Sequence, residues 1–282
     1  MRVQARLTDR DHTLLGWLAD HGVLTSFQIA HALYSSLDFA QRRLRTLTDV
    51  GLLARFRPFR AEGGTHPYHY VLGQLGTEIV AAHRGEDLPR RDQARRRRWH
   101  LTNRANLPHL LGVNQFFTDL AGHARTHPDA ALELWLPESR FRSAAVPELR
   151  DLHAVVYYAR IRPDGYGTWT EHGHRVSFFL EHDNGTEPQH TLVSKVHAYA
   201  ELARETGRAW PVLFWLPTAV RERHLHRHLA KAGTSYPVAT AARDSAAQRA
   251  ASPADDVWWL HRHDGPRQRL AHLHRDDHPS DP

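Results

Sequence analysis

Cysteine is absent from the 282-residue sequence, and long apolar runs are missing as well. Without cysteine the chain has no disulfide bonds and no thiolate ligands for zinc, which is compatible with the cytosol. The apolar runs fall short of the ~18 residues that cross a bilayer, and the first residues lack the apolar core of a signal peptide. We therefore expect a cytoplasmic protein without a membrane partner, and the length suggests about two domains.

Lysine is also scarce. The chain contains two lysines, Lys195 and Lys231, against thirty-five arginines. Because arginine serves almost wherever a positive charge is needed, a lysine on an inward face indicates a need for a compact ammonium group. The alternative is a lysine whose aliphatic stem packs on its helix while the charge reaches water.

The basic residues are concentrated in the first third of the chain. Residues 1–104 contain seventeen Lys and Arg against ten Asp and Glu, whereas residues 105–282 contain twenty against twenty-one. This surplus predicts a polyanionic partner, and double-stranded DNA is the first candidate. The twenty-four histidines are scattered through polar segments. We interpret them as compositional drift, with a metal-binding histidine tract as the alternative.

Residues 8–50 carry three signals for the start of a helix. Each is a capping box, in which two side chains satisfy free backbone amides of the first helical turn. The boxes pair Thr8 with Asp11, Thr25 with Gln28, and Ser35 with Asp38. Strands are predicted at 52–59 and 68–72. Three helices followed by a hairpin predict a winged helix-turn-helix domain.

The predicted winged helix is rich in arginine where such domains contact DNA. The third helix would enter the major groove, and the hairpin would contact the backbone or the minor groove. The candidate DNA contacts are Arg42, Arg43 and Arg45 on the helix and Arg55 and Arg57 on the hairpin. The alternative is a protein-interaction winged helix whose arginines are simply solvated.

An arginine-rich segment follows, with six arginines among residues 90–98. The like charges in such a run repel one another, and the side chains stay solvated unless an anion is present. We predict DNA contact through Arg95, Arg96, Arg97 and Arg98, against the alternative of a soluble linker. The predicted limits are 1–88 for the winged helix, 89–105 for the linker, 106–273 for a second domain and 274–282 for a disordered tail.

The second domain is expected to alternate strands and helices. Apolar and β-branched runs predict strands at 132–137, within 151–160, at 176–183 and at 210–217. Helical spacing of apolar residues predicts helices at 107–127, 190–206 and 221–232. Residues 237–256 are expected to form a mobile connection, and residues 257–260 an edge strand.

Four polar residues are predicted to meet at one edge of this second domain. Asp164 lies in a turn before the strand that carries Glu181 and Asp183, and side-chain alternation places these two acids on one face. Lys195 lies on the inward side of the helix that follows. An ordinary Pro-Asp-Gly turn and a polar strand end are the structural alternatives.

The ordered pattern PDG…FFLEHDNGTE…LxxKxxxY, preceded by HLLGVNQFF, resembles the replication-relaxation family of plasmids and mobile elements. It is also similar to the PD-(D/E)xK restriction-endonuclease-like superfamily. The resemblance covers roughly residues 8–217. It implies a fold of the α+β or α/β class, with an N-terminal winged helix-turn-helix followed by a restriction-endonuclease-like αβββαβ domain.

The resemblance also implies a metal-dependent centre. Asp164, Glu181 and Asp183 would hold Mg²⁺ or Mn²⁺ if the domain is catalytic, because these ions prefer oxygen ligands. The superfamily places a lysine two residues after the glutamate, where this chain has Asp183. Lys195 would then supply the ammonium group from the helix. Asn114 is the expected equivalent of an acidic residue that related domains carry on their first helix.

Three functions are compatible with these features. The favoured one is a DNA-binding accessory protein that serves a relaxase or a replication initiator, because the family's lysine is displaced. The second is an active Mg²⁺-dependent endonuclease or nickase that uses Asp164, Glu181 and Lys195. The third is a winged-helix transcriptional regulator, for which the sequence offers no ligand signature. A homodimer is left open.

Overall fold

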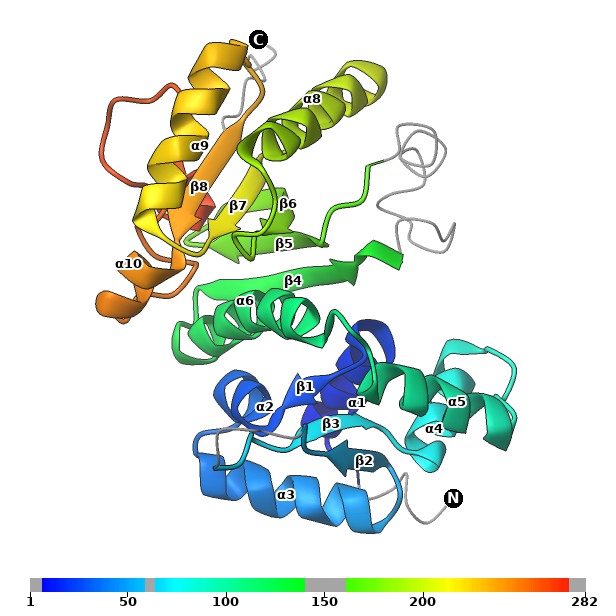
Figure 1. The fold of residues 1–282 in the computed structure, drawn as a ribbon. Coiled ribbons are helices and arrows are strands. Elements are labelled where there is room, and N and C mark those ends of the chain that lie inside the picture. The colour runs from blue at the N-terminus through cyan, green and yellow to red at the C-terminus, as the bar shows by residue number, and fades with distance from the viewer. Residues whose placement is uncertain (1–6, 59–63, 140–160, 274–282) are drawn as a thin grey trace, which may run out of the picture. The chain divides into compact units, whose positions relative to one another are not determined.

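The computed structural model describes residues 7–58, 64–139 and 161–273. Over these residues it has a mixed α+β fold with two sheets, and the chain divides into two compact units, residues 1–122 and 123–282 (Figure 1). The division falls within α6 (Leu107–Thr126), whereas the sequence placed the boundary in the arginine-rich segment 89–105. The predicted tail 274–282 and the predicted strand within 151–160 lie outside the described residues.

The first unit opens with three helices. They are α1 (Asp9–His21), α2 (Ser26–Leu33) and α3 (Leu37–Asp49). The capping boxes predicted for Thr8 and Thr25 are both present, with each hydroxyl accepting from a backbone amide. The third prediction was wrong by one residue, because Ser36 rather than Ser35 accepts from the Phe39 amide.

A small sheet completes the hairpin region of this unit. Strands β2 (Leu53–Phe56) and β3 (His69–Leu72) pair antiparallel, and the two-residue strand β1 (Leu24–Thr25) pairs with the other edge of β3. Both hairpin strands are shorter than predicted. Helix α4 (Gln74–Arg84) follows and ends at Gly85.

The arginine-rich segment is a helix rather than an open linker. It forms α5 (Arg91–Thr102), whose Leu101 packs against the apolar cluster that contains Val23 and Val71. Gly22 has a positive φ of 79°, and a Cβ atom there would lie 2.8 Å from the Leu101 side chain. Leu101 therefore anchors this mostly polar helix near its end, a feature that the charge run concealed.

An ion pair joins α1 to α3. The carboxylate of Asp11 is fully buried and accepts hydrogen bonds from the Arg43 guanidinium, with Nε at 3.0 Å. Asp11 also accepts from the Thr8 amide and hydroxyl at the start of α1. Burial opposes ionisation, but Arg43 and Thr8 outweigh it and lower the pKa of Asp11. Arg43 thus stabilises the unit, a role different from the DNA contact predicted for it.

The second unit contains a six-stranded sheet. Its strands are β4 (Ala130–Pro137), β5 (Gly165–Glu171), β6 (His174–His182), β7 (Val212–Leu216), β8 (Val238–Ala242) and β9 (Trp259–Leu260), in this spatial order. β4, β5 and β6 pair antiparallel, β6, β7 and β8 pair parallel, and β9 returns antiparallel on β8. The buried parallel strand and the returning edge strand were both predicted.

One part of this sheet was predicted wrongly. β5 follows the predicted Asp164 turn, and its tyrosine, tryptophan and threonines are residues that favour strands. β8 and α10 (Arg243–Gln248) occupy the segment expected to be a mobile connection. That prediction was wrong because a short alanine-rich strand has a weak propensity, and burial on both faces decides its conformation.

Helices α8 (Gln189–Thr206) and α9 (Ala219–Ala232) lie side by side over one face of the sheet (Figure 1). Phe179, Phe214 and Val238 from the strands pack against Val196 of α8 and Leu225 of α9. The C-terminal segment continues to a short 3₁₀ helix, η4 (Leu270–His272). Among the described residues, no helix combines the length and apolar character that crossing a membrane requires.

We expect Arg43→Ala to lower the free energy of unfolding by about 2–4 kcal/mol, because it leaves the Asp11 carboxylate buried without its cation. The exposed neighbour Arg42 is the matched control, and Arg42→Ala should cost less than about 0.5 kcal/mol. Urea denaturation followed by circular dichroism measures both. Because the folded pKa of Asp11 is depressed, the Arg43→Ala deficit should be present at pH 7 and shrink toward pH 3. Equal costs for the two variants would contradict the structural role.

Candidate functional site

Glu181 is the centre of a buried polar cluster at the end of β6. The residue retains 3% exposure, and both of its carboxylate oxygens are bound by side chains from α8. Oε1 accepts from the Tyr199 hydroxyl at 2.6 Å, and Oε2 accepts from Lys195 Nζ at 2.9 Å. The predicted meeting of Glu181 with Lys195 is therefore present in the structure.

Helix geometry explains why these two donors act together. Lys195 and Tyr199 are four residues apart, so both side chains lie on the face of α8 that carries Val196 into the core. Lys195 is one-third exposed and reaches a second carboxylate, with Nζ 3.1 Å from Oε2 of Glu187. One ammonium group thus bridges a buried and an exposed acid.

Burial sets the protonation of the cluster. Burial and the nearby Asp164 carboxylate raise the pKa of Glu181 to about 7, although Lys195 and Tyr199 favour its ionised form. Burial would lower the pKa of Lys195, but Glu181 and Glu187 outweigh it and raise that pKa above its ordinary value. Burial and the Glu181 charge raise the pKa of Tyr199 well above 10.0. Lys195 is therefore a cation and Tyr199 a neutral donor at neutral pH.

Asp164 joins the cluster through the backbone of β6. Its amide donates to the Leu180 carbonyl at 3.0 Å, and its Oδ2 accepts from the His182 amide at 2.7 Å. These two hydrogen bonds go to the neighbours of Glu181 on either side, so they fix the Asp164 turn beside the end of the strand. Asp164 is close enough to Glu181 to oppose its ionisation.

Asp183 does not share this environment. Its carboxylate forms an ion pair with Arg221 at the start of α9, with Nη2 3.1 Å from Oδ1, and it also accepts from the Gly185 amide. Within the described ranges, no three His, Asp or Glu side chains gather as ligands for a metal ion. The predicted ligand set of Asp164, Glu181 and Asp183 is therefore not assembled, because Arg221 holds the third acid. No sequence signal pointed to Arg221.

Asn114 was also expected near the centre. Its side-chain amide instead donates to the carbonyl oxygens of Val23, at 2.7 Å, and His21, at 3.3 Å. All three residues belong to the first unit. The prediction for Asn114 was wrong, because the residue satisfies the backbone that follows α1.

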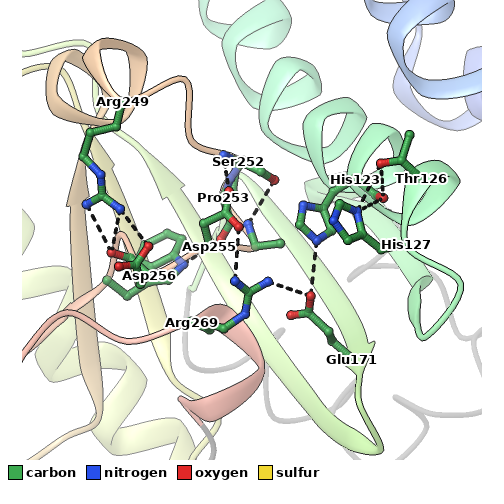
Figure 2. Close-up of polar contacts among 12 residues, drawn as sticks. His123, Thr126, His127, Glu171, Arg249, Ser252, Pro253, Asp255, Asp256 and Arg269 are labelled. Carbon is green, nitrogen blue, oxygen red and sulfur yellow. Dashed lines mark hydrogen bonds and ion pairs between the residues drawn. The ribbon is translucent and has the colours of Figure 1, made fainter.

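A second buried cluster lies around Glu171 at the end of β5, and it was missed (Figure 2). Glu171 Oε1 binds Arg269 at 2.7 Å and His123 Nε2 at 3.2 Å, while Arg269 also pairs with Asp255 at 3.2 Å. Burial opposes the charge on Glu171, but Arg269 and His123 outweigh it and lower its pKa. Burial and the stacked ring of His127 lower the pKa of His123. This cluster ties the C-terminal segment to the sheet.

The hairpin region of the first unit forms a basic groove of about 220 Å³. Arg45 of α3 lines it together with Arg55 and Arg57 of the hairpin, as do Gln41 and Tyr68. The guanidiniums of Arg55 and Arg57 lie 4.2 and 3.7 Å from the centre of the Tyr68 ring. Three of the five arginines predicted to contact DNA here therefore face one concave surface.

The arginines of α5 are placed differently from one another. Arg95 and Arg96 are exposed, Arg97 donates to the Ala19 carbonyl, and Arg98 is partly buried. Arg95 and Arg96 can therefore bind an external anion without giving up a contact within the first unit.

Comparison with protein families gives a match for most of the chain. The family model described as replication-relaxation matches residues 15–214. The chain belongs to the replication-relaxation family. The match includes α3, the hairpin, and all of Asp164, Glu181, Asp183 and Lys195.

Two further comparisons concern individual proteins. No curated protein matches this replication-relaxation chain. Among solved structures it is similar to the crystal structure of Bacillus subtilis PadR in complex with operator DNA, with 12% identity over 77% of this chain and 96% of that chain. The TM-score is 0.21, which is too low for that likeness to support an argument.

The raised pKa of Glu181 predicts a pH-dependent stability. The folded pKa of about 7 exceeds the ordinary value of 4.5. The contribution of Glu181 to the free energy of unfolding is therefore complete below pH 4.5 and is lost as the pH rises through 7. This shift of the Glu181 pKa corresponds to roughly 3 kcal/mol in the free energy of unfolding. We expect Glu181→Gln to gain stability relative to the parent by up to that amount between pH 5 and pH 8.

Urea denaturation of parent and variant at each pH measures this difference, and the subtraction cancels the many histidines that titrate in the same range. Glu201→Gln, an exposed change on the same helix, is the control and should show a pH-independent difference. A flat difference for Glu181→Gln would refute the assignment.

Proposed function

We propose that this replication-relaxation protein is a DNA-binding accessory protein of plasmid or mobile-element replication or transfer. In this role the first unit is a winged helix that binds double-stranded DNA, and the second unit is a degenerate nuclease-like domain. The partner enzyme would be a relaxase or a replication initiator. The observation that carries the proposal is the groove formed by Arg45, Arg55 and Arg57 on a helix and a hairpin.

The chemistry of this groove favours DNA over a protein partner. Guanidinium groups form paired hydrogen bonds with phosphate and with the major-groove edge of guanine. Gln41 lies one turn before Arg45 on α3, so an amide that suits adenine stands beside a group that suits guanine. Stacking on Tyr68 holds the two hairpin arginines extended over the surface. The basic surplus of the first third of the chain adds long-range attraction.

The contacts made by the acidic residues of the second unit support an accessory role. Among the described elements of this unit, the order β4, β5, β6, α8, β7 is the one expected of a restriction-endonuclease-like core. Its acids are nevertheless engaged, because Glu181 is bound by Lys195 and Tyr199, and Asp183 by Arg221. These residues, as arranged, do not fit a ligand set for Mg²⁺ or Mn²⁺, which would need free carboxylate oxygens.

An active nuclease is the second candidate. The contact between Lys195 and Glu181, with Asp164 close by, favours it, since the superfamily resemblance calls for an acid pair and an ammonium group in one place. The position of Lys195 on α8, fourteen residues after the glutamate, supports the accessory role instead.

DNA binding is tested by fluorescence anisotropy with a labelled 30-base-pair duplex. Arg45→Ala and Arg55→Ala should each weaken binding severalfold and reduce the slope of log affinity against log salt by about one. Arg204→Ala, an exposed arginine on α8, is the control and should leave both quantities unchanged. Unchanged affinity in the groove variants would end the DNA assignment for this surface.

Cleavage is tested by incubating supercoiled plasmid with the protein and either Mg²⁺ or Mn²⁺. The accessory role predicts no more nicking by the parent than by the double variant Asp164→Ala with Glu181→Ala. Metal-dependent nicking that the double variant lacks would establish the nuclease instead.

A further inference from the structure

A pocket of about 620 Å³ lies in the second unit, between α9 and the turn that follows β9. Four residues of α9 line it at intervals of three and four, so they form one face of the helix. The lining residues are Arg223, His226, Arg227 and Ala230 from α9, and Trp259, His261, Arg262, His263 and Asp264 from β9 and the turn after it. None of them belongs to the Glu181 cluster or to the basic groove. The volume lies within the range of roughly 300–1,000 Å³ typical of small-molecule sites.

The pocket carries an excess of positive charge. Arg223, Arg227 and Arg262 are exposed and make no ion pair with any residue in the described part of the chain. Arg223 and Arg227 are four residues apart, a spacing at which like charges destabilise a helix. Asp264 is the one acid among the lining residues. Guanidiniums gathered around a concave surface in this way favour a bound anion, and phosphate suits their geometry best.

The backbone holds one of these arginines in place. Arg262 has a φ of 62°, the left-handed conformation that non-glycine residues rarely adopt. Such conformations persist where the surrounding structure imposes them, and they are concentrated at ligand sites. The turn after β9 therefore presents Arg262 to the pocket at a conformational cost.

The pocket also has an aromatic lining. The rings of His226 and Trp259 stack with centroids 3.7 Å apart, and a hydrogen bond of 2.8 Å to Thr240 fixes the His226 ring. His261 Nε2 is buried and has no hydrogen-bond partner among the described residues. Burial lowers the pKa of His226 to about 4 and also lowers that of His261, so both rings are neutral at pH 7. Neutral aromatic rings at the pocket suit the stacking of a planar heterocycle.

We propose that this pocket binds a nucleotide, with the phosphate against Arg223, Arg227 and Arg262 and the base against the aromatic lining that contains His261. A free nucleotide and the phosphorylated end of a DNA strand present the same chemistry. The inference does not depend on the proposed function, because it uses no residue of the Glu181 cluster or of the basic groove.

Isothermal titration calorimetry on the full chain tests this proposal. The probes are dAMP, inorganic phosphate, and a ten-nucleotide single strand with or without a 5′-phosphate. The strand is titrated into protein that carries Arg45→Ala with Arg55→Ala, so that binding at the basic groove is weakened. We expect dAMP, or the 5′-phosphorylated strand, to bind at least tenfold more tightly than inorganic phosphate.

The double variant Arg223→Gln with Arg227→Gln should weaken that binding at least tenfold, and Arg262→Gln at least threefold. Arg204→Gln is the control and should change it less than twofold. Circular dichroism confirms that each variant is folded, as expected for exposed side chains without ion pairs. Binding of dAMP supports a free nucleotide, and binding of the phosphorylated strand alone supports a strand end. Binding of phosphate as tight as that of dAMP and the strand, or binding unchanged in the double variant, would overturn the proposal.

Discussion

The second unit depends on how one buried carboxylate is satisfied. Glu181 lies at the end of a central strand under α8, where a bare charge would be strongly disfavoured. Lys195 and Tyr199 meet this requirement from a single helical face, and Glu187 shares the ammonium group from outside. The same contacts attach α8 to the sheet edge, because both donors to the Glu181 carboxylate belong to that helix.

The sequence predicted structural features correctly where residues close in the chain determine them. Capping boxes identified the starts of α1 and α2, and the apolar run at 210–217 identified β7. Helical spacing placed Lys195 on the inward side of its helix, where the structure shows it in contact with Glu181. These features depend on neighbours within a few residues, so a pattern in the sequence reports them directly.

Prediction failed where distant contacts override the local pattern. The sequence around Arg43 gave no sign of its ion pair with a buried acid on another helix. Asp183 has the strand position of a metal ligand, yet Arg221 lies thirty-eight residues later and was not foreseen. β8 lacks strand-like composition and is held by strands on both sides. In each case the partner that decides the outcome is remote in sequence, and no spacing rule points to it.

The link between Arg269 and Glu171 bears on where this chain could be shortened. Arg269 lies near the end of the described residues, yet it supplies the positive charge for an acid buried at the far end of β5. A gene truncated just after β9 would encode every strand of the sheet and leave Glu171 without that cation. The final segment is thus an integral part of the sheet's electrostatics, and an expression boundary chosen from strand content alone would remove it.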